Sequence, residues 1–385
     1  MKTVLIQPPQ TQLFQPRAYI PLGLAYLGAV LEAAEVDVQI LNLADNPDPQ
    51  PSDISPADWY GVSCVTATKD AVKKLIPMLG GRTVIGGPHP SVLPEETAAE
   101  LKPDVVMTGE AEYMFRNLVM GKIAPEPIMN AGFLEDLNVL PFPARHLFKD
   151  SDVVDRSGIH GQEKGAPATT VITSRGCPFS CTFCCKGHPM FNWYRYRDAS
   201  NVFEELTLLK ERYEIEHVRF VDDEFTLHKG RSAELMKVIR PLGFTWVCIT
   251  RADTVDASLL RLMKLAGCTE VHIGVETGSD RLLRLMNKQT TSKILKHGIN
   301  LIKEAGIRVK TYLMVNYPGE TEEDREATIE FMRETKPDKY TISRFIPLPG
   351  SAVERVTRQK GAVWFYPDED AKYQEYKKRI EEALQ

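Results

Sequence analysis

Short apolar runs alternate with longer segments of helical character through roughly the first 120 residues. A near-continuous apolar run of this length is typical of a parallel strand that is buried on both faces. The intervening segments 23–34 and 68–79 predict helices. The expected strands are 3–6, 36–41, 60–65, 83–85 and 105–108. Five strand–helix units predict a doubly wound, Rossmann-like open sheet, whose ligand lies at the carboxyl ends of its strands.

A second alternation of strands and helices begins near residue 166. Helices end in Gly267 and Gly306, since glycine adopts the left-handed conformation of a helix C-terminus without steric cost. The expected strands are 170–173, 217–221, 244–249, 270–275, 309–315 and 340–345. Six units are too few for a closed eight-stranded barrel. They predict a partial (β/α) TIM-like barrel with its chemistry at the carboxyl ends of the strands.

A proline-rich segment with little periodicity, from Gly121 to about Gly165, separates the two alternations. The highly charged end of the chain is most simply read as a solvated helix. The expected domains are residues 1–135 for the first fold, 136–165 for a linker, 166–350 for the partial barrel and 351–385 for a short helical tail.

Composition and charge exclude several classes of protein. The 385 residues include 47 Lys and Arg against 52 Asp and Glu, which leaves a net charge of −5. Ordinary globular composition excludes a disordered or collagen-like chain, and mild acidity argues against a protein that coats nucleic acid. The first residues enter a strand directly, and no apolar stretch is long enough to span a membrane. We expect a cytoplasmic, reduced protein.

Four of the seven cysteines fall within nine residues, which is unlike a disulfide framework. Cys177, Cys181 and Cys184 form a C-x3-C-x2-C pattern directly after a predicted strand. Three thiolates on one loop can hold three irons of a [4Fe–4S] cluster and leave the fourth iron open. Zinc would more often show four ligands, and the spacing alone leaves both zinc and metal-free buried cysteines as alternatives. Cys185 breaks the spacing and is interpreted as a bystander.

This motif resembles that of the radical S-adenosylmethionine (SAM) enzymes, and two strand-end segments extend the resemblance over about residues 166–350. These are Val275-Glu276-Thr277-Gly278-Ser279 and Val315-Asn316-Tyr317-Pro318-Gly319-Glu320. The resemblance implies that Phe183 packs on the adenine of SAM, that Glu276 contacts SAM and that Gly319 belongs to the cofactor site. It also implies one-electron cleavage of SAM to a 5′-deoxyadenosyl radical.

Other charged or aromatic residues at the strand ends have two interpretations each. Arg251 pairs with the SAM carboxylate or with Asp253. Asp223 contacts SAM or substrate, or caps its loop. Tyr312 and Arg344 lie on strands expected to line the barrel, where they bind substrate or quench a radical, or else pack in the core. The basic and aromatic segment 186–195 covers the active site or is a surface loop.

The first domain, together with the barrel, resembles the cobalamin-binding radical SAM family. The matching segments are Ile20-Pro21-Leu22-Gly23-Leu24-Ala25-Tyr26-Leu27, Ile85-Gly86-Gly87-Pro88-His89-Pro90, Thr108-Gly109-Glu110-Ala111-Glu112 and Leu140-Pro141-Phe142-Pro143-Ala144-Arg145. The resemblance implies a corrin whose nucleotide tail lies across the strand ends, with Gly109 in the same site. Ser63 and Thr66 would hydrogen-bond the tail. Gly86 and Gly87 would let the backbone approach it, or form a plain tight turn. The D-x-H-x-x-G signature of many cobalamin proteins is absent.

The leading hypothesis is a cobalamin-dependent radical SAM methyltransferase that methylates an unactivated carbon, or phosphorus, of a small-molecule, lipid or peptide substrate. Its expected cofactors are a [4Fe–4S] cluster, SAM and cobalamin, and its expected electron donor is a flavodoxin or ferredoxin. The alternative is a radical SAM enzyme that performs a rearrangement, cyclisation or oxidation, with or without cobalamin. A non-catalytic electron carrier and a nucleic-acid methylthiolating enzyme are disfavoured.

Overall fold

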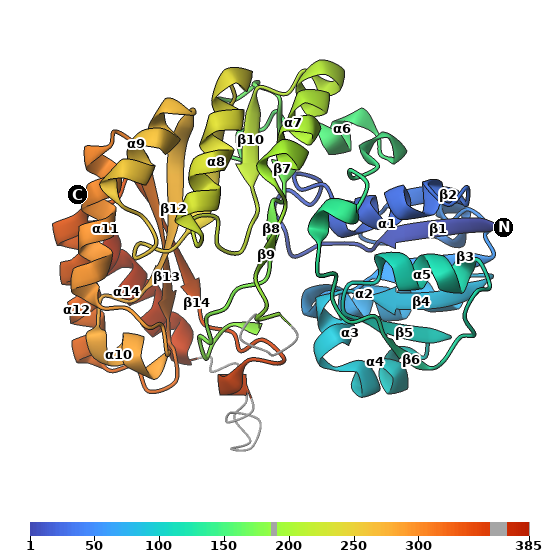
Figure 1. Ribbon diagram of the computed structural model, residues 1–385. Coiled ribbons are helices and arrows are strands. Elements are labelled where there is room, and N and C mark those ends of the chain that lie inside the picture. Colours follow the sequence, from blue (N-terminus) through green and yellow to red (C-terminus); the bar gives the residue numbers. More distant parts are fainter. Residues whose placement is uncertain (186–190, 355–367, 385) are drawn as a thin grey trace. The chain divides into compact units, whose positions relative to one another are not determined.

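The chain folds into two compact units, Met1–Ile159 and His160–Gln385 (Figure 1). The computed structural model describes residues 1–185, 191–354 and 368–384, with side chains from residue 373 onward in the last range. Half of the segment expected to cover the active site, residues 186–190, lies outside the described residues. The two units are treated separately below.

The first unit contains a six-stranded, fully parallel sheet. Its strand order is β2-β1-β3-β4-β5-β6. The strands are β1 (Lys2–Gln7), β2 (Asp37–Asn42), β3 (Trp59–Ser63), β4 (Arg82–Gly86), β5 (Val105–Thr108) and β6 (Ile128–Asn130). The chain leaves β1 toward β2 and later continues on its other side with β3. The topological switch point therefore lies at the carboxyl ends of β1 and β3, where an open sheet of this kind binds ligands.

Helices cover both faces of this sheet. Helices α1 and α5 pack together, and α2 packs against α4. The helices of the unit are α1 (Leu22–Glu32), α2 (Lys69–Leu75), α3 (Pro88–Val92), α4 (Pro94–Leu101), α5 (Glu112–Val119) and α6 (Asp150–Val153), with 3-10 turns η1 (Pro51–Asp53), η2 (Thr66–Thr68), η3 (Ile76–Met78), η4 (Leu137–Val139) and η5 (Arg145–Leu147). The doubly wound prediction is confirmed. The expected helix over 68–79 is instead α2 followed by the separate turn η3.

The sixth strand was not predicted. Strand β6 has only three residues and lies within the proline-rich segment that has little periodicity. It pairs in parallel with β5 through the register Val106↔Ile128, Met107↔Met129 and Thr108↔Asn130. Because three residues carry no recognisable alternation, only the pairing with β5 reveals this strand.

The second unit contains another six-stranded parallel sheet, of order β14-β13-β12-β11-β10-β7. Its strands are β7 (Ala168–Val171), β10 (His217–Phe220), β11 (Thr245–Thr250), β12 (Cys268–Glu276), β13 (Arg308–Val315) and β14 (Lys339–Arg344). Each strand predicted from the sequence is present within two residues at either end. The sequential strand order confirms the open, partial barrel.

Helices line one face of this sheet (Figure 1). They are α7 (Ala199–Tyr213), α8 (Lys229–Ile239), α9 (Ala257–Leu265), α10 (Asp280–Leu285), α11 (Ser292–Glu304) and α12 (Glu322–Thr335), with the turn η7 (Arg240–Leu242). As predicted, Gly267 and Gly306 follow helices with positive φ angles of 96° and 71°.

Alternate residues of each strand point to opposite faces of the sheet. On β13, the residues that face the helices are buried: Val309, Thr311, Leu313 and Val315. Lys310, Tyr312 and Met314 are partly exposed on the opposite side. We call this side of the sheet, away from the helices, the inner face.

The charged end of the chain forms α14 (Asp368–Ala383), so the predicted helix is present. The expectation that it is solvated is wrong. Tyr376 and Ile380 are 2% and 0% exposed, and the Tyr376 hydroxyl contacts the carbonyl oxygen of Arg325 on α12 at 3.4 Å. The two apolar residues are separated by four positions and therefore share one helix face, which explains how so charged a segment packs on α12.

Candidate functional site

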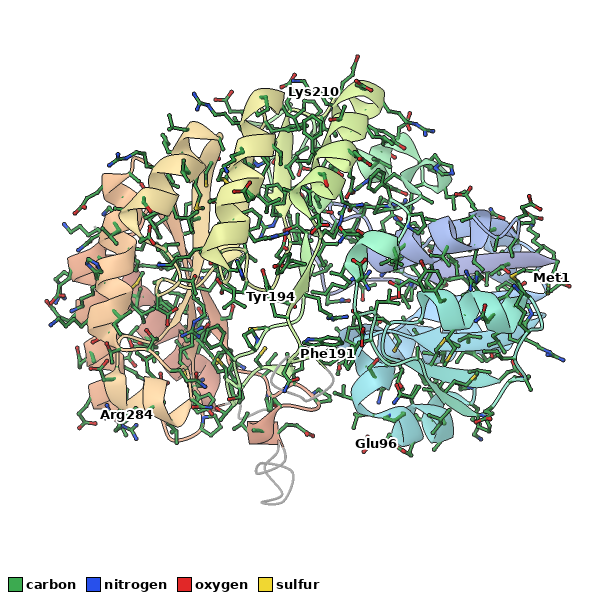
Figure 2. All side chains as sticks on the ribbon, viewed as in Figure 1. Met1, Glu96, Phe191, Tyr194, Lys210 and Arg284 are labelled. Atoms are coloured by element: carbon green, nitrogen blue, oxygen red, sulfur yellow. The ribbon has the colours of Figure 1, made fainter. Side chains whose placement is uncertain are left out.

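The three cysteines of the C-x3-C-x2-C motif lie on a loop that follows a small antiparallel ladder. Strand β8 (Ser174–Arg175) pairs with β9 (Arg195–Tyr196). Gly176 has a φ of 87°, and a Cβ atom there would collide with the carbonyl oxygen of Trp193. The Cys177 amide donates to the carbonyl oxygen of Phe191 at 3.1 Å. Figure 2 shows Phe191 near the segment that leads into β9.

The other side of this loop is held by segments that follow β12, β13 and β14. The Thr182 amide donates to the carbonyl oxygen of Met286 at 2.9 Å, and its hydroxyl lies 2.7 Å from that of Tyr317. The Val353 amide donates to the carbonyl oxygen of Thr182 at 3.0 Å. Phe183 packs against the buried cluster that contains Met286, Tyr317 and Val353. The loop is therefore anchored at the carboxyl edge of the sheet.

All seven cysteines lie in described parts of the chain, and none forms a disulfide, as predicted. Cys64, Cys248 and Cys268 are at most 1% exposed, whereas Cys177 and Cys184 are partly exposed and Cys181 is 9% exposed. The motif cysteines are thus the accessible ones. Burial raises the pKa of the Cys181 thiol, while the nearby cations Lys288 and Arg251 act in the opposite direction.

Within the described residues, no group of three or more His, Cys, Asp and Glu side chains is gathered closely enough to hold a single metal ion. Tetrahedral zinc would require thiolate sulfurs about 4 Å apart. A [4Fe–4S] cube takes one ligand at each of its four iron corners and so needs thiolate sulfurs that are more widely separated. Three cysteines on one anchored loop, next to two cations that offset the charge of thiolates, fit a [4Fe–4S] cluster.

A buried ion pair lies beside Cys181. The Lys288 ammonium is 2.9 Å from Oε1 of Glu276, and both side chains are about one-tenth exposed. Burial disfavours the charged lysine, but Glu276 and Cys181 together raise the pKa of Lys288. The same ammonium lies 5.6 Å from the ring centroid of Phe183. Two predicted residues, Phe183 and Glu276, are therefore brought together with a lysine that we did not predict.

Glu276 ends β12 in a left-handed backbone conformation, with a φ of 65°, at a break in the register with β13. A Cβ atom on Gly274 would lie 2.5 Å from the Glu276 carboxylate and 3.1 Å from the Lys288 ammonium. Glycine at 274 therefore makes the space in which the ion pair sits. Non-glycine residues adopt such a backbone at a cost of the order of 1–2 kcal/mol, which the surrounding structure must offset.

Arg251 follows β11 and makes the ion pair with Asp253 that was one of its two predicted roles. Its guanidinium donates to both carboxylate oxygens of Asp253, at 2.8 and 2.7 Å. It also donates to the carbonyl oxygen of Lys288 at 2.8 Å and stacks 3.9 Å above the ring of Phe179 on the cysteine loop. Arg251 thus holds the cysteine loop and the Lys288 segment together.

Of the three acidic residues after β10, two are buried and one is partly exposed. Asp222 accepts from the hydroxyl of Thr173 at 2.7 Å, and Glu224 accepts from the amide of Arg251 at 3.1 Å. Asp223 lies between them, partly exposed, and its charge acts on Cys177. Asp222 and Glu224 therefore brace the strand ends, and Asp223 is the partly exposed residue of the three, with its charge near Cys177.

Gly319 lies in the loop after β13, with a φ of 86°. Its carbonyl oxygen accepts from Arg281 at 2.6 Å, and a Cβ atom would lie 3.2 Å from Leu285. In this loop the Asn316 amide donates to the Glu320 carboxylate at 2.8 Å. Gly319 is thus required by the turn that contains Tyr317, in which the Glu320 amide donates to the carbonyl oxygen of Tyr317.

Tyr312 lies on the inner face, as predicted. Arg344 does not. The register Tyr312↔Thr341 places Thr341 and Ser343 on the inner face of β14, so Arg344 projects to the opposite side. Its guanidinium stacks 5.2 Å from the ring of Tyr373 on α14. We predicted the strand correctly but assigned Arg344 to the wrong face, and we leave it out of the site.

In the first unit, the predicted residues gather at the carboxyl ends of β3, β4 and β5. Ser63 is opposite Gly86 in the register, and Gly86 is opposite Met107. A Cβ atom on Gly86 would meet only the carbonyl oxygen of Met107, at the ordinary distance of 3.7 Å. The protein's own packing does not require a glycine there, so the open space at Gly86 fits a ligand that approaches the backbone.

Gly87 and Gly109 have internal reasons to be glycine. Gly87 has a φ of 117°, and its Cβ atom would lie 2.7 Å from the carbonyl oxygen of Cys64. Gly109 has a φ of 80° and packs against Gly132, and its amide donates to the hydroxyl of Ser91 at 3.1 Å. Of the two interpretations of Gly87, a tight turn is therefore the one that its local contacts explain. Both residues shape the same strand edge.

Thr66 begins η2 and is exposed, but its hydroxyl is already engaged. Thr66 Oγ1 lies 3.1 Å from Nδ1 of His89, which is 4% exposed. The amide of His89 donates to the carbonyl oxygen of Cys64 at 3.2 Å. Sequence reasoning missed this partnership, because His89 is 23 residues from Thr66 and meets it only through the turn at Gly87.

Comparison with known proteins supports both units. A family model described as the radical SAM superfamily matches residues 171–332, and one described as the B12 binding domain matches residues 17–119. An uncharacterized methyltransferase of Pyrococcus horikoshii, PH0819, is 30% identical over 378 residues, which cover 91% of this chain and 82% of that protein. The chain belongs to the cobalamin-binding radical SAM family.

Two further comparisons place this cobalamin-binding radical SAM protein among its relatives. An anaerobic magnesium-protoporphyrin IX monomethyl ester cyclase of Rubrivivax gelatinosus is 28% identical over 363 residues, which cover 86% of this chain and 65% of the cyclase. The solved structure of the radical SAM methyltransferase TsrM from Kitasatospora setae, with cobalamin and a [4Fe–4S] cluster bound, has a TM-score of 0.73 at 16% identity. It covers 95% of this chain and 79% of TsrM, which shows a shared fold.

Family membership confirms the predicted enzyme class and the predicted cofactors, namely a [4Fe–4S] cluster, SAM and cobalamin. The alternative of a non-catalytic electron carrier is set aside. In the described part of the chain, no helix has both the length and the apolar character needed to cross a membrane.

Proposed function

We propose that this protein is a cobalamin-dependent radical SAM methyltransferase acting on a small-molecule, lipid or peptide substrate. The observation that carries the proposal is the relative PH0819, named a methyltransferase, whose similarity extends over both units rather than over the barrel alone. When bound, the cluster and SAM supply a carbon-centred radical and the corrin supplies a methyl group. The remaining question is what the side chains of this chain contribute.

In this proposal, Cys177, Cys181 and Cys184 hold the cluster. Phe183 offers an apolar ring to the adenine. The amino-acid part of SAM carries a carboxylate and an ammonium group, and the Lys288–Glu276 pair presents the complementary charges at 2.9 Å from each other. Lys288 would pair with the carboxylate of bound SAM and Glu276 with its ammonium group, so that neither residue would be left buried without a partner.

Arg251 and Asp223 have supporting roles in the same proposal. Because Arg251 is committed to Asp253 and to the Lys288 carbonyl oxygen, it orients the lysine instead of meeting SAM itself. Asp223 is partly exposed near Cys177, and we propose that its carboxylate accepts a hydrogen bond from a substrate or SAM hydroxyl. Gly319 keeps the turn that contains Tyr317 in shape.

In the first unit, Ser63 and Thr66 lie at the switch point, and we propose that their hydroxyls bond a nucleotide tail. Gly86 leaves room for that tail, and Gly87 and Gly109 shape the edge around it. The Thr66–His89 contact keeps the Thr66 hydroxyl in place before the ligand arrives.

One test is anaerobic reconstitution with iron, sulfide and hydroxocobalamin, followed by incubation with a reductant, SAM carrying a deuterated methyl group and a metabolite extract. We expect about four irons per chain. We also expect a methylated product three mass units heavier than the product formed with unlabelled SAM. The test variant is Cys181→Ala, which removes one cluster ligand. Its matched control is Cys185→Ala, which removes a neighbouring thiol. If the Cys181→Ala protein still transfers the label, the proposal is wrong.

The cyclase relative of Rubrivivax gelatinosus favours a second candidate function, a radical oxidation or cyclisation without methyl transfer. The same incubation separates the two. A methyltransferase releases 5′-deoxyadenosine together with a deuterated product, whereas an oxidase or cyclase releases 5′-deoxyadenosine and no deuterated product. We propose a flavodoxin or ferredoxin as the electron donor, and reduction of the cluster by purified flavodoxin in place of chemical reductant tests that part.

A further inference from the structure

Three side chains on the inner face form a continuous hydrogen-bonded chain. Oε1 of Glu270 lies 2.8 Å from Nε2 of His272, and Nδ1 of His272 lies 2.9 Å from the hydroxyl of Tyr312. Glu270 and His272 are 1% and 2% exposed, whereas Tyr312 is partly exposed. The chain therefore runs from a buried carboxylate to a phenol at the surface of the inner face. We call it the Glu270–His272–Tyr312 chain.

The charge on Glu270 determines the direction of every hydrogen bond in this chain. Burial opposes ionisation of Glu270, but hydrogen bonds from His272 and Lys339 outweigh it and lower its pKa to about 2. Its second oxygen, Oε2, lies 2.8 Å from the ammonium of Lys339 and 3.3 Å from Nε of Arg308. Glu270 is therefore an ionised carboxylate that only accepts hydrogen bonds.

Because Glu270 accepts, Nε2 of His272 must carry the hydrogen. A neutral imidazole has one donor nitrogen and one acceptor nitrogen, so Nδ1 of His272 accepts. The Tyr312 hydroxyl then donates its hydrogen to Nδ1. The phenol oxygen has only lone pairs left, and to any other group it is an acceptor.

The surroundings keep His272 neutral in the resting protein. Burial lowers the pKa of His272, and together with the nearby cations Arg219 and Lys310 it outweighs the opposing effect of Glu270. The groups that face this histidine are Glu270, Tyr312, Arg219 and Lys310. The Lys310 ammonium lies 5.2 Å from the ring centroid of Tyr312.

Tyr312 also lies near the Lys288–Glu276 pair along the strands. It is opposite Gly274 in the register, and Glu276 follows two residues later on β12. Two residues of a strand span roughly 7 Å, so the Tyr312 backbone lies about that far below Glu276. A Cβ atom on Gly274 would lie 2.5 Å from the Glu276 carboxylate, so this carboxylate is on the same inner face.

We propose that Tyr312 accepts a proton from an O–H or N–H group of the substrate while it passes its own phenolic proton to His272. The proposal rests on the function proposed above and narrows the substrate class to molecules that carry such a donor beside the reacting atom. The bond from hydrogen to the substrate oxygen or nitrogen breaks, and a new O–H bond forms on Tyr312. The original phenolic hydrogen moves to Nδ1 of His272, and the resulting imidazolium pairs with ionised Glu270. No atom is oxidised or reduced in this step.

The direction of the chain can be tested by nitrogen NMR on the full protein with ¹⁵N-labelled histidine and without added iron, SAM or corrin. We expect the His272 signal at pH 7 to show hydrogen on Nε2 and none on Nδ1. His272→Gln identifies the signal by removing it. If that variant does not fold, Tyr312→Phe identifies it, because the loss of the hydroxyl shifts Nδ1. Hydrogen on Nδ1 would mean that Tyr312 receives a hydrogen bond from His272, and the proposal would fail.

Proton transfer itself can be provoked without a substrate. A fluorinated tyrosine at position 312 has a more acidic phenol, and we expect its proton to move to Nδ1 and convert His272 to the imidazolium. The matched control is the same fluorinated tyrosine at Tyr340, which lies opposite Thr311 and faces the helices. It should leave His272 neutral. If the fluorinated tyrosine at position 312 ionises while His272 stays neutral, the proposal is wrong.

These measurements do not depend on methyl transfer, so their failure is distinct from failure of the proposed function. With the substrate found by deuterium labelling, Tyr312→Phe should lower kcat by about 10²–10⁴-fold, the usual contribution of a proton-transferring side chain. KM should change little, and Tyr340→Phe should retain wild-type kcat. An unchanged kcat in Tyr312→Phe would refute the role of Tyr312.

Discussion

Two adjacent glycines, Gly86 and Gly87, lead to opposite predictions when each is replaced by alanine. Gly86 ends strand β4, and a Cβ atom there would meet one carbonyl oxygen at 3.7 Å. Gly87 has a φ of 117° and a ψ of −174°, a conformation that is almost exclusive to glycine. Its Cβ atom would lie 2.7 Å from the carbonyl oxygen of Cys64. Only the second site needs glycine for the fold.

The magnitudes follow from these positions. Gly86→Ala should leave the free energy of unfolding unchanged or raise it by about 0.4–1 kcal/mol, because alanine lowers the entropy of the unfolded chain. Gly87→Ala should lower it by at least about 1–3 kcal/mol, the usual cost of such a backbone conformation, with the close contact to Cys64 adding to that. For corrin binding, Gly86→Ala should weaken affinity at least tenfold, about 1.4 kcal/mol, since its methyl group occupies the space left for the tail.

The assay has two arms on the same preparations. Urea unfolding of the corrin-free proteins, followed by the circular dichroism of the helices, gives the free energies. Titration with hydroxocobalamin, followed by corrin absorbance of the protein after gel filtration, gives the affinities. The reasoning is refuted if Gly86→Ala binds the corrin as tightly as the wild type, or if Gly87→Ala is as stable as the wild type.

Three further outcomes are expected. Cys181→Ala should bind much less iron than the wild type after reconstitution, whereas Cys185→Ala should bind the wild-type amount, and equal iron in both proteins would contradict the ligand assignment. Lys288→Met should lower the free energy of unfolding by about 3–5 kcal/mol because it leaves the Glu276 carboxylate buried without its partner, and adding Glu276→Gln should restore most of the loss in urea unfolding. Burial lowers the pKa of His217 to about 4 from 6.5. Stability should therefore be fully present above pH 6.5 and fall by up to about 3 kcal/mol as the pH decreases to 4, because the unfolded chain binds a proton that the folded chain does not. Urea midpoints across this range, compared with those of His217→Gln, measure the effect, and equal slopes in the two proteins would contradict it.

Much of the fold could be predicted because local pattern and tertiary structure agree. The apolar runs are strands because they are buried in a parallel sheet, on both faces in central strands such as β1 and β5, and Gly267 and Gly306 end helices where the backbone turns left-handed. Strand β6 escaped prediction because it depends on pairing with β5, and the helix α14 was taken as solvated because its two buried residues are outnumbered by charges. Both errors concern contacts between segments far apart in the chain.

In the candidate site, too, residues in short motifs could be predicted, whereas residues brought together by distant contacts could not. The cysteines, Phe183 and Glu276 could be predicted because they lie in short motifs. Lys288 could not, since it reaches Glu276 only after α10 and two left-handed residues, Asn287 and Gln289, return the chain to the strand end. For Arg344, the strand was evident from the sequence, but which face it projects from depends on the pairing of β14 with β13.

The burial of three cysteines has a practical consequence for counting cofactors. Cys64, Cys248 and Cys268 are closed to solvent, so a reagent cannot reach their thiols, and burial also raises the pKa of Cys64 to about 12. An alkylating reagent added to the folded protein therefore modifies only the thiols of the cysteine loop. Each ligand that is bound to iron is withdrawn from that reaction. The mass gained on alkylation falls as clusters are loaded, and a mass spectrum becomes a direct gauge of how much of a preparation is ready to react.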